Sequence, residues 1–492
     1  MKTVKAPPGA KRLIESLRNL GYECSTAIAD LIDNSLAADA SEINVEINPR
    51  TDKAPAHIII ADNGKGMDRE KLIESMRFGA FQEYSEEDLG KYGLGLKTAS
   101  LSQCTQLTVA SKPAKSRGGR SIKSVACWDL AYVYKTDDWD LLTPSFGDLE
   151  DWKREALDQA ISGDRGTVVL WSGLEEVHPL LCSGSGARRD HYLASLMAEV
   201  GDHLRMVFHR FMQGMLQDRP RLRLQVAGAE LKPWDPFCTG EDATQTLDIV
   251  KTQVEVPGGQ PGKKATVTMR PYILPREDEF SSREAWKDAS GPSNWNYQQG
   301  FYFYRNHRLL QAGGWSNLRT VDEHTKLLRV AVHFPGSLDK AFLLNITKMR
   351  AHIPTEIRSE TRDCIGKWVK AARTRYDRGI NKQQKGSQKG GVVNDAPSPK
   401  PAPAIKMAGM SFSLGNVPSH ALSITGNGDG LNVVVPQAHE CAVIFDRMNG
   451  RKGDLTRLCL ALVCLLEAVS EHRVKLTDIP LQSIRRVLRK HL

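Results

Sequence analysis

The chain has 492 residues, of which 40% are hydrophobic and 25% are charged. This length exceeds one compact core and predicts about two to four domains, and the composition excludes a disordered or fibrous protein. The net charge of +9 permits binding to a polyanion such as DNA, although a solvated basic surface would give the same balance.

No apolar run approaches the roughly 20 residues that span a bilayer, and the first residues lack the apolar stretch of a signal peptide. We therefore expect a cytoplasmic protein without membrane contact. The nine cysteines are scattered and never form Cys-x-x-Cys. Together with histidines that lack ligand spacing, this predicts reduced, buried thiols and no structural zinc.

The first part of the chain mixes helices and strands. Apolar residues at helical spacing predict helices over 11–20 and from Ser25, a plausible cap, to Leu36. Strands are predicted over 43–47, 57–61, 107–111, 124–128 and 166–171, with a further helix over 98–102. The strand 57–61 is apolar and ends at Asp62, so this carboxylate is expected where a strand meets a loop.

The second part begins with one long amphipathic helix, predicted over 191–215, which would join two domains. A second α/β module is predicted from strands over 221–226, 265–274, 300–304, 328–334 and 342–346 and a helix over 355–378. Residues 380–431 are rich in Lys, Gln, Gly, Ser and Pro, which predicts a flexible linker. Beyond it, residues 455–469 and the basic 484–492 predict a small helical unit.

Four short polar motifs carry the chemistry, and the first lies on the second helix. Asp30 and Asn34 are four residues apart, so both project from one helix face, with Asp33 beside them. A neutral amide oxygen at Asn34 suits Mg²⁺, and a carboxylate nearby could accept a proton from water attacking a phosphate. Alternatively, Asp33 and Asn34 simply end a helix.

The next motif follows the strand that ends at Asp62. This carboxylate could accept a hydrogen bond from the exocyclic amine of adenine, while Gly64 and Gly66, just before Met67, would let the backbone approach the base. A surface hairpin turn is the alternative.

A glycine-rich stretch then leads into a helix. Gly90, Gly93 and Gly95 offer free backbone N–H groups, and the helix start at 96–98 attracts phosphate. Lys97 would add a mobile cation there. The stretch is neither the Gly-x-x-x-x-Gly-Lys-Ser/Thr phosphate loop nor a dinucleotide fingerprint. Gly166-Thr167 forms the fourth motif.

In this order and spacing the motifs resemble those of the GHKL (Bergerat-fold) ATPases, which include gyrase, heat-shock chaperone, histidine kinase and MutL members. The resemblance implies ATP and Mg²⁺ as cofactors, Asp30 as the base and Asn34 as the magnesium ligand. It implies nucleotide contacts from Asp33, Asp62, Gly64, Gly66, Met67, Gly90, Gly93, Leu94, Gly95, Leu96, Lys97, Thr98 and Thr167.

The second module is similar to the S5-like transducer domain of the dimeric members. In those proteins a transducer lysine reaches the γ-phosphate, and the segment Asn345-Ile-Thr-Lys348 makes Lys348 the candidate. The expected fold class is therefore α+β. The domains would be an ATP-binding Bergerat domain (1–178), a transducer (179–378), a flexible linker (379–431) and a small helical domain (432–492).

Within the family, residues 93–100 and 300–308 look most like the MORC-type branch and its bacterial relatives. The Gly-Phe-Arg-Gly-Glu-Ala-Leu element of a MutL lid is absent from the sequence. One position departs from the family pattern, because the base is usually Glu and here it is Asp30. The shorter side chain must sit closer to the attacking water or act through a second water, which predicts slow turnover.

The resemblance implies an ATP-driven molecular clamp. ATP would order a lid at 79–95, the segments 1–22 would join two copies in a homodimer, and the clamped object would be double-stranded DNA, in antiviral genome defence or DNA repair. A chaperone-like ATPase with protein clients is an alternative. A third possibility is a nucleotide sensor whose C-terminal unit recruits a partner protein.

Overall fold

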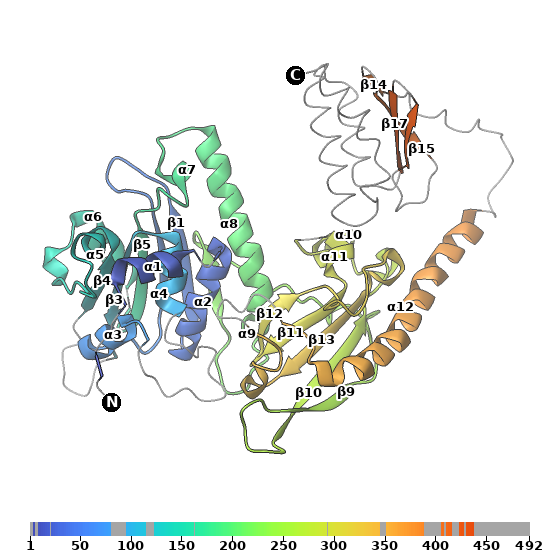
Figure 1. Ribbon diagram of the computed structural model, residues 1–492, viewed down its shortest axis with the longest axis horizontal. Coiled ribbons are helices and arrows are strands. Elements are labelled where there is room, and N and C mark those ends of the chain that lie inside the picture. Colours follow the sequence, from blue (N-terminus) through green and yellow to red (C-terminus); the bar gives the residue numbers. More distant parts are fainter. Residues whose placement is uncertain are drawn as a thin grey trace. The chain divides into compact units, whose positions relative to one another are not determined.

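The computed structural model describes residues 3–436 apart from 5–7, 20, 80–94, 115–122, 162, 293, 345–350, 388–404, 408–409, 416–422 and 428–429. The chain divides into two compact units, residues 1–389 and 390–492. The first unit contains two β-sheets, each covered by helices (Figure 1).

The first sheet has seven strands in the order β4-β3-β5-β2-β1-β6-β7. Its strands are β1 (Glu42–Asn48), β2 (His57–Asp62), β3 (Gln106–Lys112), β4 (Ser124–Asp129), β5 (Gly166–Ser172), β6 (Arg223–Val226) and β7 (Ala229–Glu230). The accompanying helices are α1 (Ala10–Arg18), α2 (Cys24–Ala37), α3 (Arg69–Met76), α4 (Gly95–Gln103), α5 (Leu130–Thr136), α6 (Asp151–Ala160), α7 (Pro179–Cys182), α8 (Ala187–Val207) and α9 (His209–Met212).

Alternation along β2 gives this sheet two apolar faces. Ile58 and Ile60 point into a core shared with α1, α2, α4 and α8, whereas Ile59 and Ala61 point into a smaller core under α6. Helix α2 packs against α4 and α8 within the larger core. Because side chains alternate, Asp62 at the end of β2 lies on the same face as Ile58 and Ile60, the face covered by α2.

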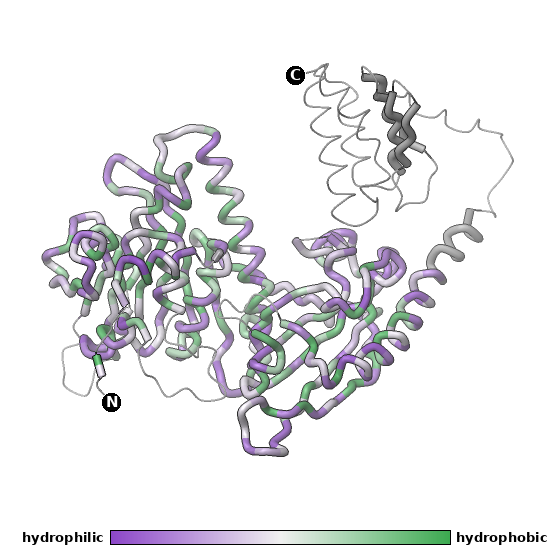
Figure 2. The backbone as a smooth tube through the Cα atoms, in the orientation of Figure 1, coloured by the Kyte–Doolittle hydropathy of each residue, from purple (hydrophilic) through white to green (hydrophobic). Residues whose placement is uncertain are grey.

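The second sheet has six strands, in the order β12-β11-β13-β10-β8 with β9 also paired to β10. Its elements are β8 (Gln245–Thr246), β9 (Val250–Glu255), β10 (Lys264–Ile273), β11 (Gly300–Arg305), β12 (Arg308–Ala312), β13 (Leu328–Phe334), α10 (Arg283–Ala289), α11 (Asn294–Gln298) and α12 (Arg358–Ser387). A core of aromatic and branched residues fills the space between this sheet and α12. Hydrophobic residues gather along the strands of both sheets (Figure 2).

The predicted mixture of helices and strands is confirmed, and the fold class is α+β. Eleven expected elements are present with shifted ends: α1, α2, α4, β1, β2, β3, β4, β5, β10, β11 and β13. The cap predicted for α2 is wrong, because the helix begins at Cys24 and Ser25 lies inside it. The N-cap residue is Glu23, whose side chain makes no capping hydrogen bond.

The single helix predicted over 191–215 is also wrong. Helix α8 begins at Ala187 and ends at Val207, and Phe208 leaves the helical conformation with φ −105° and ψ 14°. The short α9 follows, and all four of its residues are buried. Arg210 of α9 packs on the ring of Tyr304 from the second sheet, with its guanidinium carbon 3.5 Å from the ring centroid. Tertiary contacts therefore interrupt a pattern whose periodicity alone would continue the helix.

Three further expectations differ from the structure. The strand Arg223–Val226 pairs in parallel with β1 and so belongs to the first sheet rather than to the second module. Residues 342–343 form a turn, and the remainder of the predicted strand 342–346 is only partly described. Helix α12 extends to Ser387, beyond the expected end of the second module.

Part of the predicted linker is ordered into strands. Four strands, β14 (Ile405–Met407), β15 (Met410–Gly415), β16 (Ser423–Asn427) and β17 (Gly430–Pro436), form a separate sheet in the second unit. Alternation in Met-Ser-Phe-Ser-Leu and the apolar run of β17 are the strand signals that the proline-rich composition of 397–404 obscured. The helices predicted over 455–469 and 484–492 lie outside the described residues.

Among the described cysteines all are free thiols, as predicted. Cys24, Cys104 and Cys127 are buried, and Cys182, Cys238 and Cys364 are partly buried. In the described part of the chain, no helix combines the length and apolarity that crossing a membrane requires.

Candidate functional site

The Asp62 carboxylate is held between its own loop and α2. Its Oδ1 accepts a hydrogen bond from the backbone N–H of Gly64 at 2.9 Å, and its Oδ2 accepts one from the Ser35 hydroxyl of α2 at 2.8 Å. Burial raises the pKa of the Asp62 carboxyl, and these hydrogen bonds oppose the rise. The backbone of Thr167 adds a third hydrogen bond. The carboxylate is therefore fixed in orientation, and of its roughly four acceptor positions one is left to accept from an amine.

A pair of hydroxyl groups extends this polar cluster across the sheet. Thr167 of β5 lies opposite Asp62 of β2, and its hydroxyl is 2.8 Å from the Ser111 hydroxyl of β3. The Ser111 hydroxyl also accepts a 2.8 Å hydrogen bond from the backbone N–H of Met67. The predicted motifs around Asp62 and Thr167 thus meet in space, and Ser35 and Ser111 join them without having been predicted from the sequence.

Two glycines are needed for this close assembly. Gly66 has φ +68°, and a Cβ there would lie 2.0 Å from the carbonyl oxygen of Lys112. Gly166 has φ +144°, and a Cβ there would lie 2.1 Å from the carbonyl oxygen of Asp62. Only glycine fits at these two positions, because the neighbouring backbone occupies the space that a Cβ would need. Gly64 lies buried between these two contacts.

The first motif lies on α2, on the same side of the sheet as Asp62. Asp30 and Asp33 are buried, with exposed fractions of 4% and 2%, whereas Asn34 is exposed. The hydroxyl of Tyr22 donates a 3.0 Å hydrogen bond to Asp30 Oδ2. Asn34 immediately precedes Ser35, so the candidate magnesium ligand is directly joined to the residue that holds Asp62.

A residue from the second sheet completes this group. The buried guanidinium of Arg308, the first residue of β12, donates from Nη2 to Asp30 Oδ1 at 3.1 Å and from Nε to Asp33 Oδ1 at 2.8 Å. Sequence reasoning missed Arg308, because it is separated from Asp30 by 278 positions. The one signal in the sequence was that Arg308 belongs to the segment 300–308, which resembles the MORC-type branch.

Helix α4 begins at Gly95, just before the start expected at 96–98, and Leu96 is half-buried against the main core. Lys97 is not the mobile cation that was expected: it is 2% exposed, and its Nζ donates to the carbonyl oxygen of Ser75 at 2.8 Å. Burial lowers the pKa of Lys97 to about 8. Thr98 is buried as well.

The remaining predicted residues cannot be placed. Gly90, Gly93 and Leu94 of the lid and Lys348 of the second module lie outside the described residues. Among the residues that are described, no cluster of three or more His, Cys, Asp or Glu side chains could hold a metal ion. A magnesium ion at Asn34 would therefore need most of its ligands from phosphate and water.

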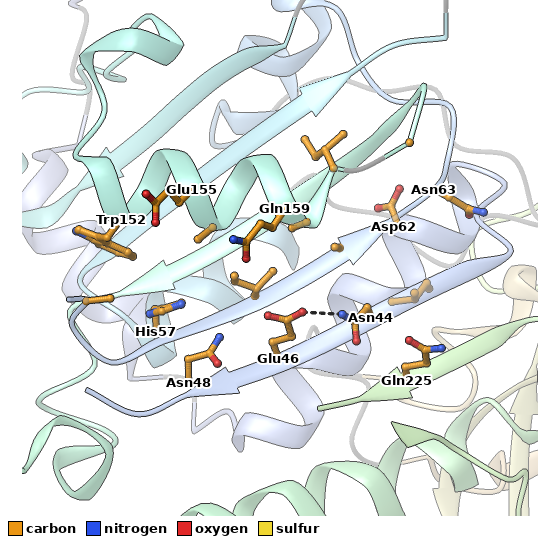
Figure 3. Close-up of a pocket in the computed structure, with 18 of the residues that line it drawn as sticks. Asn44, Glu46, Asn48, His57, Asp62, Asn63, Trp152, Glu155, Gln159 and Gln225 are labelled. Atoms are coloured by element: carbon orange, nitrogen blue, oxygen red, sulfur yellow. Dashed lines mark hydrogen bonds between the residues drawn. The ribbon is translucent and has the colours of Figure 1, made fainter. Parts of the chain in front are cut away.

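The opposite face of the first sheet carries a groove of about 790 Å³. Figure 3 shows its lining: Trp152, Glu155 and Gln159 from α6, and His57, Glu46 and Asn44 from β2 and β1. Asp62 borders one end of this groove, but its carboxylate bonds to Ser35 on the α2 side. The groove and the predicted nucleotide site therefore lie on different faces of the sheet.

Comparison with known proteins agrees with this geometry. Residues 22–167 match the family described as "Histidine kinase-, DNA gyrase B-, and HSP90-like ATPase". This segment begins at Tyr22 and ends at Thr167, and so contains every predicted site residue except Lys348. The residues of the first domain that surround the Asp62 carboxylate all lie within it.

Individual relatives carry the MORC name. The chain is 31% identical to Protein MICRORCHIDIA 1 of Arabidopsis thaliana over 164 residues, which cover 32% of this chain and 25% of that protein. It is 30% identical to Protein MICRORCHIDIA 3 of the same plant over 144 residues, 26% of this chain and 24% of the relative. It is 37% identical to ATPase MORC2B of Mus musculus over 78 residues, 15% of this chain and 8% of that protein.

The fold and these matches define the class: residues 22–167 form an ATPase domain of the GHKL type. Within that class the chain is similar to MORC proteins of Arabidopsis thaliana and Mus musculus. It spans about a quarter of the length of the plant relatives that it matches.

Proposed function

We propose that this protein binds ATP on the α2 face of the first sheet and hydrolyses it slowly. The hydrogen bond between Ser35 and Asp62 is the observation that carries the proposal. It joins the candidate adenine acceptor to the helix that bears Asp30 and Asn34, so base recognition and phosphate chemistry share one rigid frame. The match of residues 22–167 to an ATPase family supports it.

Magnesium is part of this proposal, and the residues present fit it. Asn34 is exposed and offers a neutral amide oxygen, a ligand type that Mg²⁺ accepts when phosphate oxygens and waters supply the rest of its octahedral shell. When bound, the ion would neutralise charge on the phosphates. Asp30 would act as the base that accepts the proton of the attacking water.

Slow hydrolysis follows from the length of the Asp30 side chain. Its carboxylate is 4% exposed, and Tyr22 and Arg308 fix its orientation. Because the side chain is one methylene shorter than that of glutamate, the carboxylate reaches an attacking water less readily.

Calorimetry with ATP in magnesium buffer tests the site. We expect binding by the parent and by Asp30→Asn, with phosphate release only from the parent, and loss of binding in Asp62→Asn. Asp151→Asn is the matched control, because this residue lies on α6 at the groove on the opposite face. If the parent gives no heat with adenosine nucleotides, or if Asp30→Asn hydrolyses ATP at the parental rate, the assignment is wrong.

We further propose that ATP closes the protein as a homodimeric clamp on double-stranded DNA. In this proposal ATP orders the lid at 79–95, residues 1–22 join two copies, and Lys348 links the γ-phosphate to the second module acting as a transducer. The net charge of +9 supports a polyanionic partner. Genome defence or DNA repair would be the setting.

Mass in solution tests the clamp, with ADP and with a non-hydrolysable ATP analogue, each with and without duplex DNA. A dimer that forms only with the analogue, and ATPase stimulation by DNA that weakens steeply with salt, would support it, because phosphate contacts release counterions. Salt-insensitive stimulation by a polypeptide would favour a chaperone-like ATPase instead. Dimerisation without phosphate release would favour a nucleotide sensor that recruits a partner.

A further inference from the structure

The hairpin β11–β12 of the second sheet reaches into the first domain. Its two connecting residues, Asn306 and His307, both have positive φ, of 47° and 68°, as the tight two-residue turns of hairpins require. This turn sets Arg305 directly opposite Arg308. Strand β12 is an edge strand of its sheet and packs against α8 (Figure 1).

The guanidinium of Arg308 is buried beside α2 and the end of α8. Its side chain is 4% exposed, and its guanidinium carbon lies 5.9 Å from the centre of the Phe208 ring at the end of α8. Burial and then the charge of Arg308 lower the pKa of His203 to about 4, so an uncharged imidazole is the neighbour on α8. The cation is thus enclosed by apolar and neutral groups and by the two carboxylates of α2.

The two hydrogen bonds of Arg308 divide between the carboxylates. Its Nε bonds to Asp33 and its Nη2 to Asp30, and the two bonds come from the same planar group. A planar guanidinium offers its donors in a fixed fork, so the position of one bond determines the direction of the other. The bond to Asp33 therefore fixes the plane of the guanidinium. In that orientation the guanidinium donates to Oδ1 of Asp30, while Tyr22 donates to Oδ2.

Among the described residues, the adenine side of the site is held from the first domain. The Asp62 carboxylate accepts hydrogen bonds from the Ser35 hydroxyl and from the backbone of Gly64 and Thr167, and all three residues belong to that domain. A displacement of the β11–β12 hairpin would consequently disturb Asp30 while leaving Asp62 and its partners in place.

We propose that Arg308 is a positioning residue that orients the Asp30 carboxylate from the second domain, so that movement of the β11–β12 hairpin changes the rate of ATP hydrolysis without changing ATP affinity. This inference depends on the ATPase function proposed above. Arg308 bonds to Asp30 and Asp33 of α2 and so acts on the reaction through the base.

The test compares kcat, KM and the calorimetric Kd for ATP in Arg308→Gln, Arg308→Lys and Arg305→Gln. Misplacement of a reacting group by about 1 Å costs on the order of 100-fold in rate. We therefore expect kcat of Arg308→Gln to fall about 10- to 100-fold, with Kd within about threefold of the parent. Arg308→Lys keeps the charge and should recover part of the loss, because an ammonium can still reach one carboxylate.

Arg305→Gln is the matched control. Arg305 is also buried, lies on the same hairpin, and pairs at 2.9 Å with Asp339 inside the second domain. It should keep the parental kcat. If Arg305→Gln loses as much activity as Arg308→Gln, the effect comes from general damage to the hairpin and the proposal is overturned.

A second measurement does not require turnover. Without nucleotide, hydrogen exchange of α2 around Asp30 should be faster in Arg308→Gln than in the parent, and it should stay parental in Arg305→Gln. Parental exchange around Asp30 in Arg308→Gln, or an unchanged kcat in that variant, overturns the role of Arg308 alone. Absence of ATP binding by the parent overturns the proposed function itself and this role with it.

Discussion

The hydroxyl of Tyr22 donates a 3.0 Å hydrogen bond to Oδ2 of Asp30, and the ring of Tyr22 is buried at the point where the chain enters α2. Burial and the nearby Asp30 charge raise the pKa of Tyr22 well above its ordinary value. The phenol therefore remains protonated and donates to Asp30 near neutral pH.

Replacing Tyr22 with Phe should slow hydrolysis and spare binding. A hydrogen bond to a charged group contributes about 1.5 to 3 kcal/mol, so loss of this restraint on Asp30 should lower kcat by about 10-fold or more. Steady-state phosphate release and calorimetry with ATP measure the two effects separately. Tyr134→Phe is the control, because its hydroxyl only accepts a long 3.5 Å bond from Arg18. Equal losses of kcat and ATP affinity would contradict the assigned role.

Replacing Ser111 with Ala should weaken ATP binding. The substitution leaves the backbone N–H of Met67 without its acceptor and Thr167 without its hydroxyl neighbour. An unsatisfied donor costs about 1 to 3 kcal/mol, which corresponds to a Kd raised by about 5- to 160-fold if the Met67 loop shapes the site. Ser102→Ala should leave Kd unchanged, since that hydroxyl bonds only within its own helix. A normal Kd in Ser111→Ala would show that this loop does not contribute to binding.

Replacing Gly66 with Ala should damage the Asp62 loop. Positive φ alone costs a non-glycine residue about 1 to 2 kcal/mol, and here the added Cβ would also meet a carbonyl oxygen at 2.0 Å. Gly228→Ala separates the two effects, because Gly228 has φ +78° and no atom within 4 Å of the new Cβ. Urea unfolding of both variants should show a clearly larger loss for Gly66→Ala. Equal losses would mean that the loop shifts without cost.

Buried histidines should make the protein sensitive to acid. Burial lowers the pKa of His178 from 6.5 to about 4, and the imidazole bonds to Tyr192 at 2.9 Å. As the pH falls from 6.5 toward 4, the unfolded chain gains a proton at this site that the folded chain does not, so stability decreases. At about 1.4 kcal/mol per pKa unit, His178 alone would contribute a loss of about 3 kcal/mol at pH 4.

The variant His178→Gln tests this linkage. The free energy of unfolding, measured with urea between pH 7 and pH 4, should fall less steeply in this variant than in the parent. The difference in slope should correspond to the uptake of about one proton on unfolding. His191→Gln is the control, because this side chain is exposed. A parental slope in His178→Gln would show that His178 does not stay neutral in the folded protein.

The sequence by itself determined the local parts of the site. Apolar residues at helical spacing placed Asp30, Asp33 and Asn34 on α2, and an apolar run ending in a carboxylate placed Asp62 at the end of β2. Helices and strands can be predicted in this way because their periods of 3.6 and 2 residues can be recognised within a short segment of sequence. The family resemblance then supplied the expected fold of the first domain.

The tertiary structure decided which of these residues meet and what else joins them. Arg308 reaches Asp30 across 278 positions, and Ser35 reaches Asp62 across 27. The same long-range packing assigned Arg223–Val226 to the first sheet and ended α8 at Phe208. Local periodicity cannot specify such contacts, because they depend on which faces of distant elements become buried against each other.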